Sequence, residues 1–260
     1  MLHREHSRGT LVISQPAHAW VSGQMARAWG NDQFGDFAPR AEVELAAELH
    51  DIGFLRWEEK PTLDRTTGLP HTFLTMPMQT HLDIWLEGIH QMERYGRYPA
   101  VLVSMHYCWL CQQHPHYENP QNAMLVQDFL DTQAAYQTFA IGSLGREPLY
   151  AAEAQEQTIL RNRQLVSAWD LLSLLICGGI EAPRTIENVP SASETKALVL
   201  TPRDEHAMQY FLTPWPFRAP RIELICEARM MTETYKSSRE MLMGLQNSEI
   251  VPLKFELTPG

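Results

Sequence analysis

The sequence predicts a mainly α-helical protein that carries a small β-containing region at its C-terminal end. Up to about residue 178, apolar residues recur at helical spacing in stretches that Pro and Gly separate. After Gly179 they form short runs, two of them alternating with polar residues, as is typical of strands. We therefore expect a helical body over residues 1–180 and a strand-containing appendage over residues 181–260 that packs on it.

The first helix is expected over residues 14–29. Pro16 suits its first turn, because a proline lacks the N–H that would be unpaired there, and Gly30 follows its end. Helical spacing puts His18 and Ser22 on the same face as the apolar residues. This helix therefore presents one imidazole from its first turn.

The second helix is expected to begin near Pro39 and to stop before Gly53. Ala47 and His50 share one of its faces, and the His50-Asp51 pair falls in its last turn. The unpaired carbonyl groups of a last turn carry partial negative charge, which favours a cation nearby. This location suits a metal ion.

The rest of the chain divides into one long loop, further helices and short strands. Residues 54–79 contain three prolines and no clear period, which predicts a long ordered loop, and loops of this length are more often functional than not. Further helices are expected over residues 80–95, 99–113, 120–141 and 150–177. Strands are expected over residues 197–200, 221–226 and 252–257.

The residue composition excludes several classes of protein. Hydrophobic residues make up 44% and charged residues 20%, a globular balance rather than a disordered one. No run reaches the roughly 18 apolar residues of a membrane helix, and the N-terminal residues lack the apolar core of a signal peptide. A net charge of −10 disfavours binding to nucleic acid backbones. We expect a soluble, cytoplasmic protein with no membrane or nucleic-acid partner, and the composition is compatible with a homo-oligomer.

The four cysteines do not form a disulfide framework in a chain of this length. Cys108 and Cys111 have the two-residue gap of a zinc pair, and His114 and His116 follow closely, so a structural zinc is conceivable. The pair also lies in an apolar helical run, where residues three apart are simply neighbours. We interpret the cysteines mainly as small core residues.

Two polar residues stand out because their helices are otherwise apolar. His106 lies in the predicted helix over residues 99–113, where a buried imidazole needs a partner, and a metal or a carbonyl serves equally. Asp170 lies among apolar residues, and an ionised carboxylate there is costly unless a cation neutralises it. That cation is either a metal or an arginine such as Arg161 or Arg163.

The order His, His-Asp, His, His, Asp over residues 14–178 resembles the HD-domain superfamily of metal-dependent phosphohydrolases. Four motifs are also similar to a bacterial branch of that fold, from which no substrate is carried over: Gln-Pro-Ala-His at 15–18, Leu-Val-Ser-Met-His at 102–106, Trp-Asp-Leu-Leu-Ser-Leu at 169–174 and Pro-Trp-Pro-Phe at 214–217. The resemblance implies an HD-type helical bundle. The Gly-Tyr-Pro signature of the cyclic-dinucleotide phosphodiesterases in the superfamily is absent.

The resemblance also implies the metal ligands. They are His18, His50, Asp51 and Asp170 for a first ion, with Asp51 as a bridge, and His81 and His106 for a second. His90 is the rival of His81; the two lie nine residues apart and face opposite ways on a straight helix. We prefer His81 because it lies at the junction of loop and helix.

The function implied is that of a phosphohydrolase acting on a small phosphomonoester, phosphodiester or nucleotide. Its cofactor would be one or two divalent ions, with Fe, Mn or Zn favoured over Mg by the mixed His and Asp ligands. Catalytic roles fall to Asp51, His81 and His106, and the candidates to bind substrate phosphate are Lys60 and Arg161, with Arg56 and Arg163 beside them.

Two other functions remain open at this stage. An HD-fold di-iron oxygenase would use the same ligands, so the sequence does not separate it from a hydrolase. A non-catalytic metal-binding or sensing module could use Trp215 and Phe217 of the C-terminal region as a contact surface, although these rings equally suit a cover over the helical core.

Overall fold

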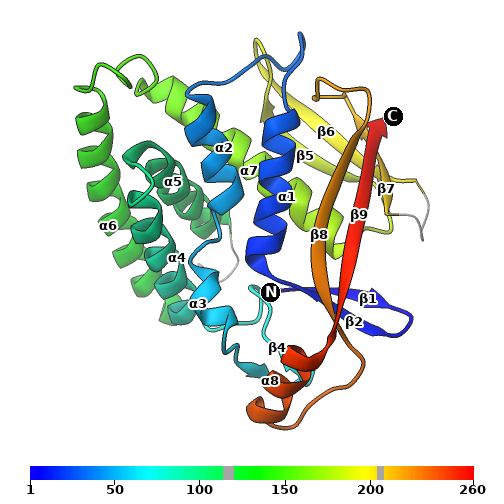
Figure 1. Ribbon diagram of the computed structural model, residues 1–260. Coiled ribbons are helices and arrows are strands. Elements are labelled where there is room, and N and C mark those ends of the chain that lie inside the picture. The colour runs from blue at the N-terminus through cyan, green and yellow to red at the C-terminus, as the bar shows by residue number, and fades with distance from the viewer. Residues whose placement is uncertain (114–119, 204–207) are drawn as a thin grey trace.

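The computed structural model describes residues 1–113, 120–203 and 208–260, and it combines a group of helices with one large curled sheet (Figure 1). The helices are α1 (Gln15–Ala28), α2 (Arg40–Leu49), α3 (Phe54–Glu58), α4 (Met78–Glu93), α5 (Arg97–Gln113), α6 (Pro120–Leu144), α7 (Glu156–Gly178) and α8 (Ser238–Asn247). The strands are β1 (Leu2–His6), β2 (Gly9–Ile13), β3 (Leu63–Asp64), β4 (Leu69–Pro70), β5 (Arg184–Pro190), β6 (Thr195–Pro202), β7 (Gln209–Thr213), β8 (Ile222–Met231) and β9 (Glu249–Pro259).

The large sheet corrects the predicted fold class. Seven strands pair in the order β1-β2-β8-β9-β7-β6-β5, and the sheet is mixed because β7 and β9 run parallel while the other pairs are antiparallel. The prediction of a mainly α, HD-type helical bundle with a small β region is therefore wrong. The six predicted helices and three predicted strands are all present, with ends that differ by up to six residues, but strands missed by the prediction make the sheet a major part of the fold.

The N-terminal hairpin is the most informative of the missed strands. β1 and β2 are joined by the two-residue turn at Ser7-Arg8, and β2 then pairs with β8, with Thr10 opposite Met231. The apolar run at the end of β2 is buried, including Ile13, which has no exposed surface. Residues from the start of the chain thus lie in the same sheet as the predicted C-terminal appendage.

Helices α1 and α7 lie between the sheet and helices α2, α4, α5 and α6, whereas α8 packs against β8 at one end of the sheet (Figure 1). α7 packs against β5 and β1, α1 packs against β8, and both contact α2 on their other side. Trp29, at the end of α1, packs edge-on against Trp169 of α7 and against Phe217, with ring centres about 5.6 Å apart in both pairs. Phe217 is buried and so belongs to the core, while Trp215 is partly buried.

The structure also describes the predicted long loop and the Cys108–Cys111 pair. The predicted loop over residues 54–79 contains α3 and the short β3–β4 hairpin. Cys108 and Cys111 lie in α5 as free thiols, and His114 and His116 lie outside the described residues. Within the described residues, no helix combines the length and apolar character needed to cross a membrane.

Candidate metal centre

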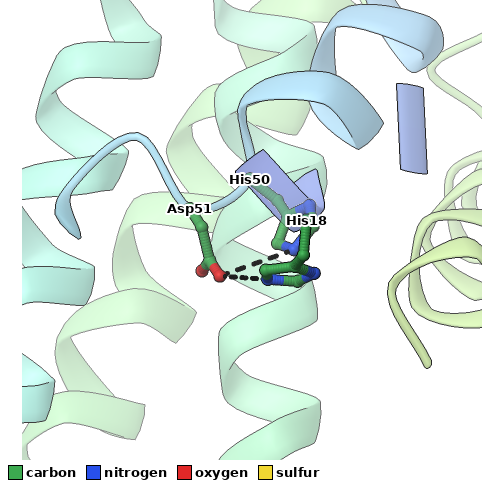
Figure 2. Close-up of side chains that lie close together, drawn as sticks. All are labelled: His18, His50 and Asp51. Atoms are coloured by element: carbon green, nitrogen blue, oxygen red, sulfur yellow. Dashed lines mark hydrogen bonds and ion pairs between the residues drawn. The ribbon is translucent and has the colours of Figure 1, made fainter. Parts of the chain in front are cut away.

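Five of the six predicted ligands converge in the interior, from four different helical segments. His18 comes from the first turn of α1, His50 and Asp51 from the end of α2, His106 from α5 and Asp170 from α7. Each is at most 5% exposed. Their ligand atoms form two overlapping groups that could hold a metal ion, His18 with His50 and Asp51, and His50 with His106 and Asp170. Figure 2 shows the first group, with both imidazoles turned toward the carboxylate.

Local sequence fixes the first of these side chains. The Ser14 side chain accepts a hydrogen bond from the N–H of Ala17 at 3.1 Å and caps α1, with Pro16 in the first turn. The position of His18 is therefore set by a rigid helix start rather than by a loop.

The His50-Asp51 pair is held by close contacts on two sides. A Cβ atom at Gly53 would lie 2.2 Å from the carbonyl oxygen of Ile84, so only glycine lets the chain pass this close to α4. From α5, the Tyr107 hydroxyl donates a hydrogen bond to the carbonyl oxygen of His50. Together these contacts fix the backbone that carries the two ligands.

The distances between ligand atoms suit a shared cation. Nε2 of His18 lies 2.7 Å from Oδ2 of Asp51. Nε2 of His50 lies 3.2 Å from Oδ1 of Asp170, and Nε2 of His106 lies 3.2 Å from Oδ2 of the same carboxylate. Neighbouring ligands of a metal with bonds of about 2.1 Å are about 3.0 Å apart in octahedral and about 3.4 Å apart in tetrahedral coordination, so the two 3.2 Å separations match it.

Each imidazole is held from behind through its Nδ1 atom. Nδ1 of His50 donates to the carbonyl oxygen of Ala47 at 2.9 Å. Nδ1 of His18 lies 2.8 Å from the Ser173 hydroxyl, which itself donates to the carbonyl oxygen of Asp170. Because the single hydroxyl hydrogen is used on that carbonyl, His18 Nδ1 must be the donor. Both rings therefore carry their hydrogen on Nδ1.

The same arrangement recurs at His106. Its Nδ1 lies 2.9 Å from the Ser167 hydroxyl, which donates to the carbonyl oxygen of Arg163 at 3.1 Å. Nδ1 of His106 is again the donor, so in the neutral ring Nε2 presents a lone pair. Metal-binding histidines characteristically donate their other ring N–H to a partner in this way.

The Nε2 atoms supply the test of whether the residues fit a metal. Those of His50 and His106 are buried and have no hydrogen-bond partner among the described residues. Both face the carboxylate of Asp170. Without a metal, His50 meets this carboxylate as an imidazolium because its pKa is raised, whereas burial lowers the pKa of His106. The neutral ring of His106 then directs a lone pair at an anionic oxygen, which is repulsive unless a cation lies between them. A metal ion satisfies the imidazoles and both carboxylates at once, so the donor set fits a metal.

The pKa shifts lead to the same conclusion. Burial raises the pKa of Asp170, but the neighbouring imidazoles of His50 and His106 outweigh it and hold the pKa well below its ordinary value. Burial lowers the pKa of His50, yet the carboxylates of Asp51 and Asp170 raise it to about 9. The carboxylates are thus ionised, and the space before them favours positive charge.

His81, the sixth predicted ligand, lies outside both groups. It is buried at the start of α4, where its ring centre is 4.2 Å from that of Trp85 and 5.8 Å from that of Phe54. His90, its rival, is exposed further along the same helix. The assignment of His81 as a metal ligand stays a prediction.

Among the described hydrogen bonds and ion pairs, none joins Lys60 or Arg161, the two predicted phosphate-binding residues, to a metal ligand. Lys60 is exposed after α3, and Arg161 is half-buried and donates to the carbonyl oxygen of Phe34 at 3.1 Å. Asp170 is not neutralised by an arginine, since its described ion-pair partners are all histidines. The alternative explanation for this carboxylate therefore does not apply to the described part of the chain.

Several supporting residues were missed in the sequence. Ser167 and Ser173 lie three residues before and three after Asp170, so all three side chains share one face of an apolar helix, which is a usable signal. Gln15 gave no signal, although its Nε2 donates to Oδ2 of Asp51 at 3.1 Å. Ser22 donates to the Ser173 hydroxyl at 2.9 Å and extends the network.

A family model described as a protein of unknown function (DUF3891) matches residues 1–233. The matched range covers most of the chain and contains all five converging ligands and the serines behind them. No curated protein matches the chain, and no solved structure matches it.

Proposed function

We propose that this chain, which belongs to the DUF3891 family, is a metal-dependent phosphohydrolase with a single metal centre. The ligands are His18, His50, Asp51, His106 and Asp170. The observation that carries the proposal is that the buried Nε2 atoms of His50 and His106 have no hydrogen-bond partner within the described parts of the chain and face the ionised carboxylate of Asp170. Three imidazoles and two carboxylates suit Fe, Mn or Zn rather than the all-oxygen environment that Mg prefers.

The chain's own groups can position the reactants. A divalent cation at this centre supplies Lewis-acid catalysis and makes water a stronger acid. Oδ2 of Asp51 is occupied by the contacts with His18 and Gln15, whereas no hydrogen bond among the described residues reaches Oδ1. We assign to Oδ1 the role of orienting the attacking water and accepting its proton.

Arg163 is the residue that we assign to the substrate phosphate. It is 9% exposed, its guanidinium lies 5.5 Å from the ring centre of Trp109, and no carboxylate among the described residues lies within ion-pair distance. It precedes Asp170 by seven residues on α7, about 10 Å along the helix axis. A buried arginine without a counter-ion has an unmet need for an anion, which a phosphate ester supplies.

The chain order of the ligands adds support from resemblance. In the HD superfamily a histidine, a His-Asp pair and a final aspartate hold the metal used for phosphate-ester hydrolysis. The large sheet distinguishes this chain from the bundle that we expected, so the resemblance applies to the helical part that bears the ligands. The substrate class is accordingly the broad one of small phosphomonoesters, phosphodiesters and nucleotides.

The test combines metal analysis with a substrate screen. Elemental analysis of the purified protein should find one divalent metal per chain, and a chelator should abolish hydrolysis that Fe, Mn or Zn then restores. Arg163→Gln should raise KM for a phosphate ester, whereas Arg161→Gln, on the same helix, should not. Comparing the metal content of His81→Ala with that of His90→Ala, whose histidine is exposed, tests whether His81 is a metal ligand.

Three results would overturn the proposal. Absence of bound metal after reconstitution removes the centre itself. A stably bound metal with no turnover of any phosphate ester leaves a non-catalytic binding or sensing module. Two irons with substrate-dependent O₂ uptake identify the oxygenase alternative.

A further inference from the structure

Gln15 has a buried carbonyl oxygen without a hydrogen-bond donor. It is the first residue of α1 and is 3% exposed. Its Nε2 donates a hydrogen bond to Oδ2 of Asp51 at 3.1 Å, whereas its Oε1 has no hydrogen-bond partner among the described residues. An unpaired buried acceptor is costly, so we expect a donor here that the protein itself does not supply.

The surroundings of Gln15 fix the orientation of its amide. If the amide were turned over, its carbonyl oxygen would face a carboxylate oxygen of Asp51, and two acceptors at this distance repel each other. The backbone is held as well, because the N–H of Gln15 donates to Oε1 of Glu58 at 2.9 Å. Oε1 of Gln15 is therefore the end of the amide that needs a partner.

The unpaired oxygen lies beside the candidate metal centre. Gln15 and His18 both reach Oδ2 of Asp51 from the first turn of α1, at 3.1 and 2.7 Å. The nitrogen and oxygen of one amide group are about 2.2 Å apart, so Oε1 lies no more than about 5.3 Å from Oδ2. One water molecule with hydrogen bonds of about 2.8 Å spans that separation. A water at the centre can thus contact Asp51 and Gln15 together.

A second buried glutamine differs from Gln15 in this respect. Gln133 of α6 is 2% exposed, and its Oε1 accepts a hydrogen bond from the Ser104 hydroxyl at 2.9 Å. The protein therefore supplies the donor for the amide oxygen of Gln133 and leaves that of Gln15 without one among the described residues. The oxygen of Gln15 is available to a molecule bound at the centre.

We propose that Gln15 positions the attacking water, an inference that rests on the phosphohydrolase function proposed above. One hydrogen of this water is directed to Oδ1 of Asp51 and the other to Oε1 of Gln15, which leaves an oxygen lone pair facing phosphorus. As the water oxygen bonds to phosphorus, the ester P–O bond breaks and its electron pair leaves with the alcohol oxygen. An amide oxygen is too weak a base to take a proton, so one proton passes to Asp51 and the other hydrogen stays on the product phosphate.

The first test needs no turnover. It measures azide binding to the cobalt-loaded full-length chain by visible absorption, because azide replaces water at a metal and has no hydrogen to donate to Oε1. Gln15→Met keeps the length of the side chain and removes the acceptor that favours water, so azide should bind about 3–10-fold more tightly. The variant also loses the hydrogen bond to Asp51, but that loss leaves more negative charge on the carboxylate and weakens azide binding. The direction of the change therefore separates the acceptor from the donor.

The second test measures hydrolysis of p-nitrophenyl phosphate at saturating metal. Gln15→Met should lower kcat about 10–100-fold and leave KM unchanged, because the phosphate is assigned to Arg163 rather than to Gln15. Gln133→Met is the matched control, since it removes an equally buried amide that faces α5. It should change neither the azide affinity nor kcat nor KM.

Three results would overturn the inference. One is azide affinity in Gln15→Met that is unchanged or weaker than in the unmutated chain. Another is a kcat for Gln15→Met equal to that of the unmutated chain. The third is a diffraction map of the metal-loaded unmutated chain with no water within about 3.2 Å of Oε1 of Gln15, a result that does not depend on whether the variants fold. Failure of the proposed function itself is distinguishable, since the unmutated chain would then bind no cobalt or hydrolyse no phosphate ester.

Discussion

Ser173→Ala tests whether the hydroxyl groups behind the imidazoles determine metal binding. Ser173 is fully buried, and its oxygen accepts from Nδ1 of His18 at 2.8 Å and from Ser22 at 2.9 Å. The substitution removes one oxygen and leaves the Nδ1–H of His18 without an acceptor. It also frees the ring to rotate away from the orientation in which Nε2 faces Asp51.

The structure sets the size of the expected effect. A buried N–H that loses its partner costs about 1–3 kcal/mol. Loss of the group that orients a metal ligand typically weakens metal binding about 10–100-fold, equivalent to about 1.4–2.7 kcal/mol. Both routes give the same magnitude, so we expect metal affinity to fall by one to two orders of magnitude (about 10–100-fold).

The assay is a competition titration with a chromophoric chelator, run beside denaturant unfolding of the metal-free protein. Ser104→Ala is the matched control because Ser104 is also fully buried, donates to Gln133 at 2.9 Å and accepts from Gln137 at 2.9 Å, facing α6. Both variants lose one buried hydroxyl and should lose comparable stability. Only Ser173→Ala should lose metal affinity.

Two results would refute this reasoning. If Ser173→Ala binds metal as tightly as the unmutated protein while losing stability, the hydroxyl serves only the fold. If Ser104→Ala loses metal affinity to the same extent, the effect is a general consequence of loosening the core. Neither result would follow from the orientation of His18.

Three further predictions concern stability. The free energy of unfolding of the metal-free protein should fall by about 3 kcal/mol as pH rises from below 6.5 to above 9. The reason is that the pKa of His50 is raised from 6.5 to about 9 in the folded state, so the charged form that stabilises the fold is lost in that pH range. Urea unfolding at constant ionic strength measures this decline, and its absence would contradict the prediction. Chelation should lower Tm by calorimetry, since a cation at a thousand times its Kd adds about 4 kcal/mol, and an unchanged Tm argues against the centre. Gly53→Ala should lower the free energy of unfolding by about 3 kcal/mol in denaturant titrations, because the new Cβ meets backbone atoms of α4. Gly178→Ala is the control and should have no such effect, since open space surrounds that position. Equal effects would show that the close approach of Gly53 to α4 is unimportant.

The converging ligands were predictable because each is chemically conspicuous where it stands. Asp170 and His106 lie in apolar helices, and His50-Asp51 lies at a helix end, so each needs a partner that its own segment does not supply. The serines behind them were not predictable in the same way, because serine is common on helices and its role depends on which imidazole faces it. His81 shares the burial of the ligands, yet its ring packs on Trp85, which the pattern of histidines in the sequence does not indicate.

Several strands of the large sheet could not be predicted from the sequence. Helices depend on local spacing, and the six predicted ones are present. β2 pairs with a strand more than two hundred residues later, and β1, which pairs with β2, is a short polar segment that carries no strong strand signal of its own. β5 and β7 were missed for a related reason, since β7 has only five residues and its register is fixed by β6 and β9 rather than by its own pattern.

The pairing of β2 with β8 constrains the order in which the chain can fold during synthesis. His18 follows β2 by a few residues, yet the strand that flanks both β2 and α1 is not translated until Met231 has been added. Contacts between such distant segments form slowly, so one apolar side of α1 stays exposed until β8 has been synthesised. A ribosome stalled before β8 would therefore hold a chain that contains all five metal ligands, while the side of α1 that β8 covers in the folded protein is still exposed.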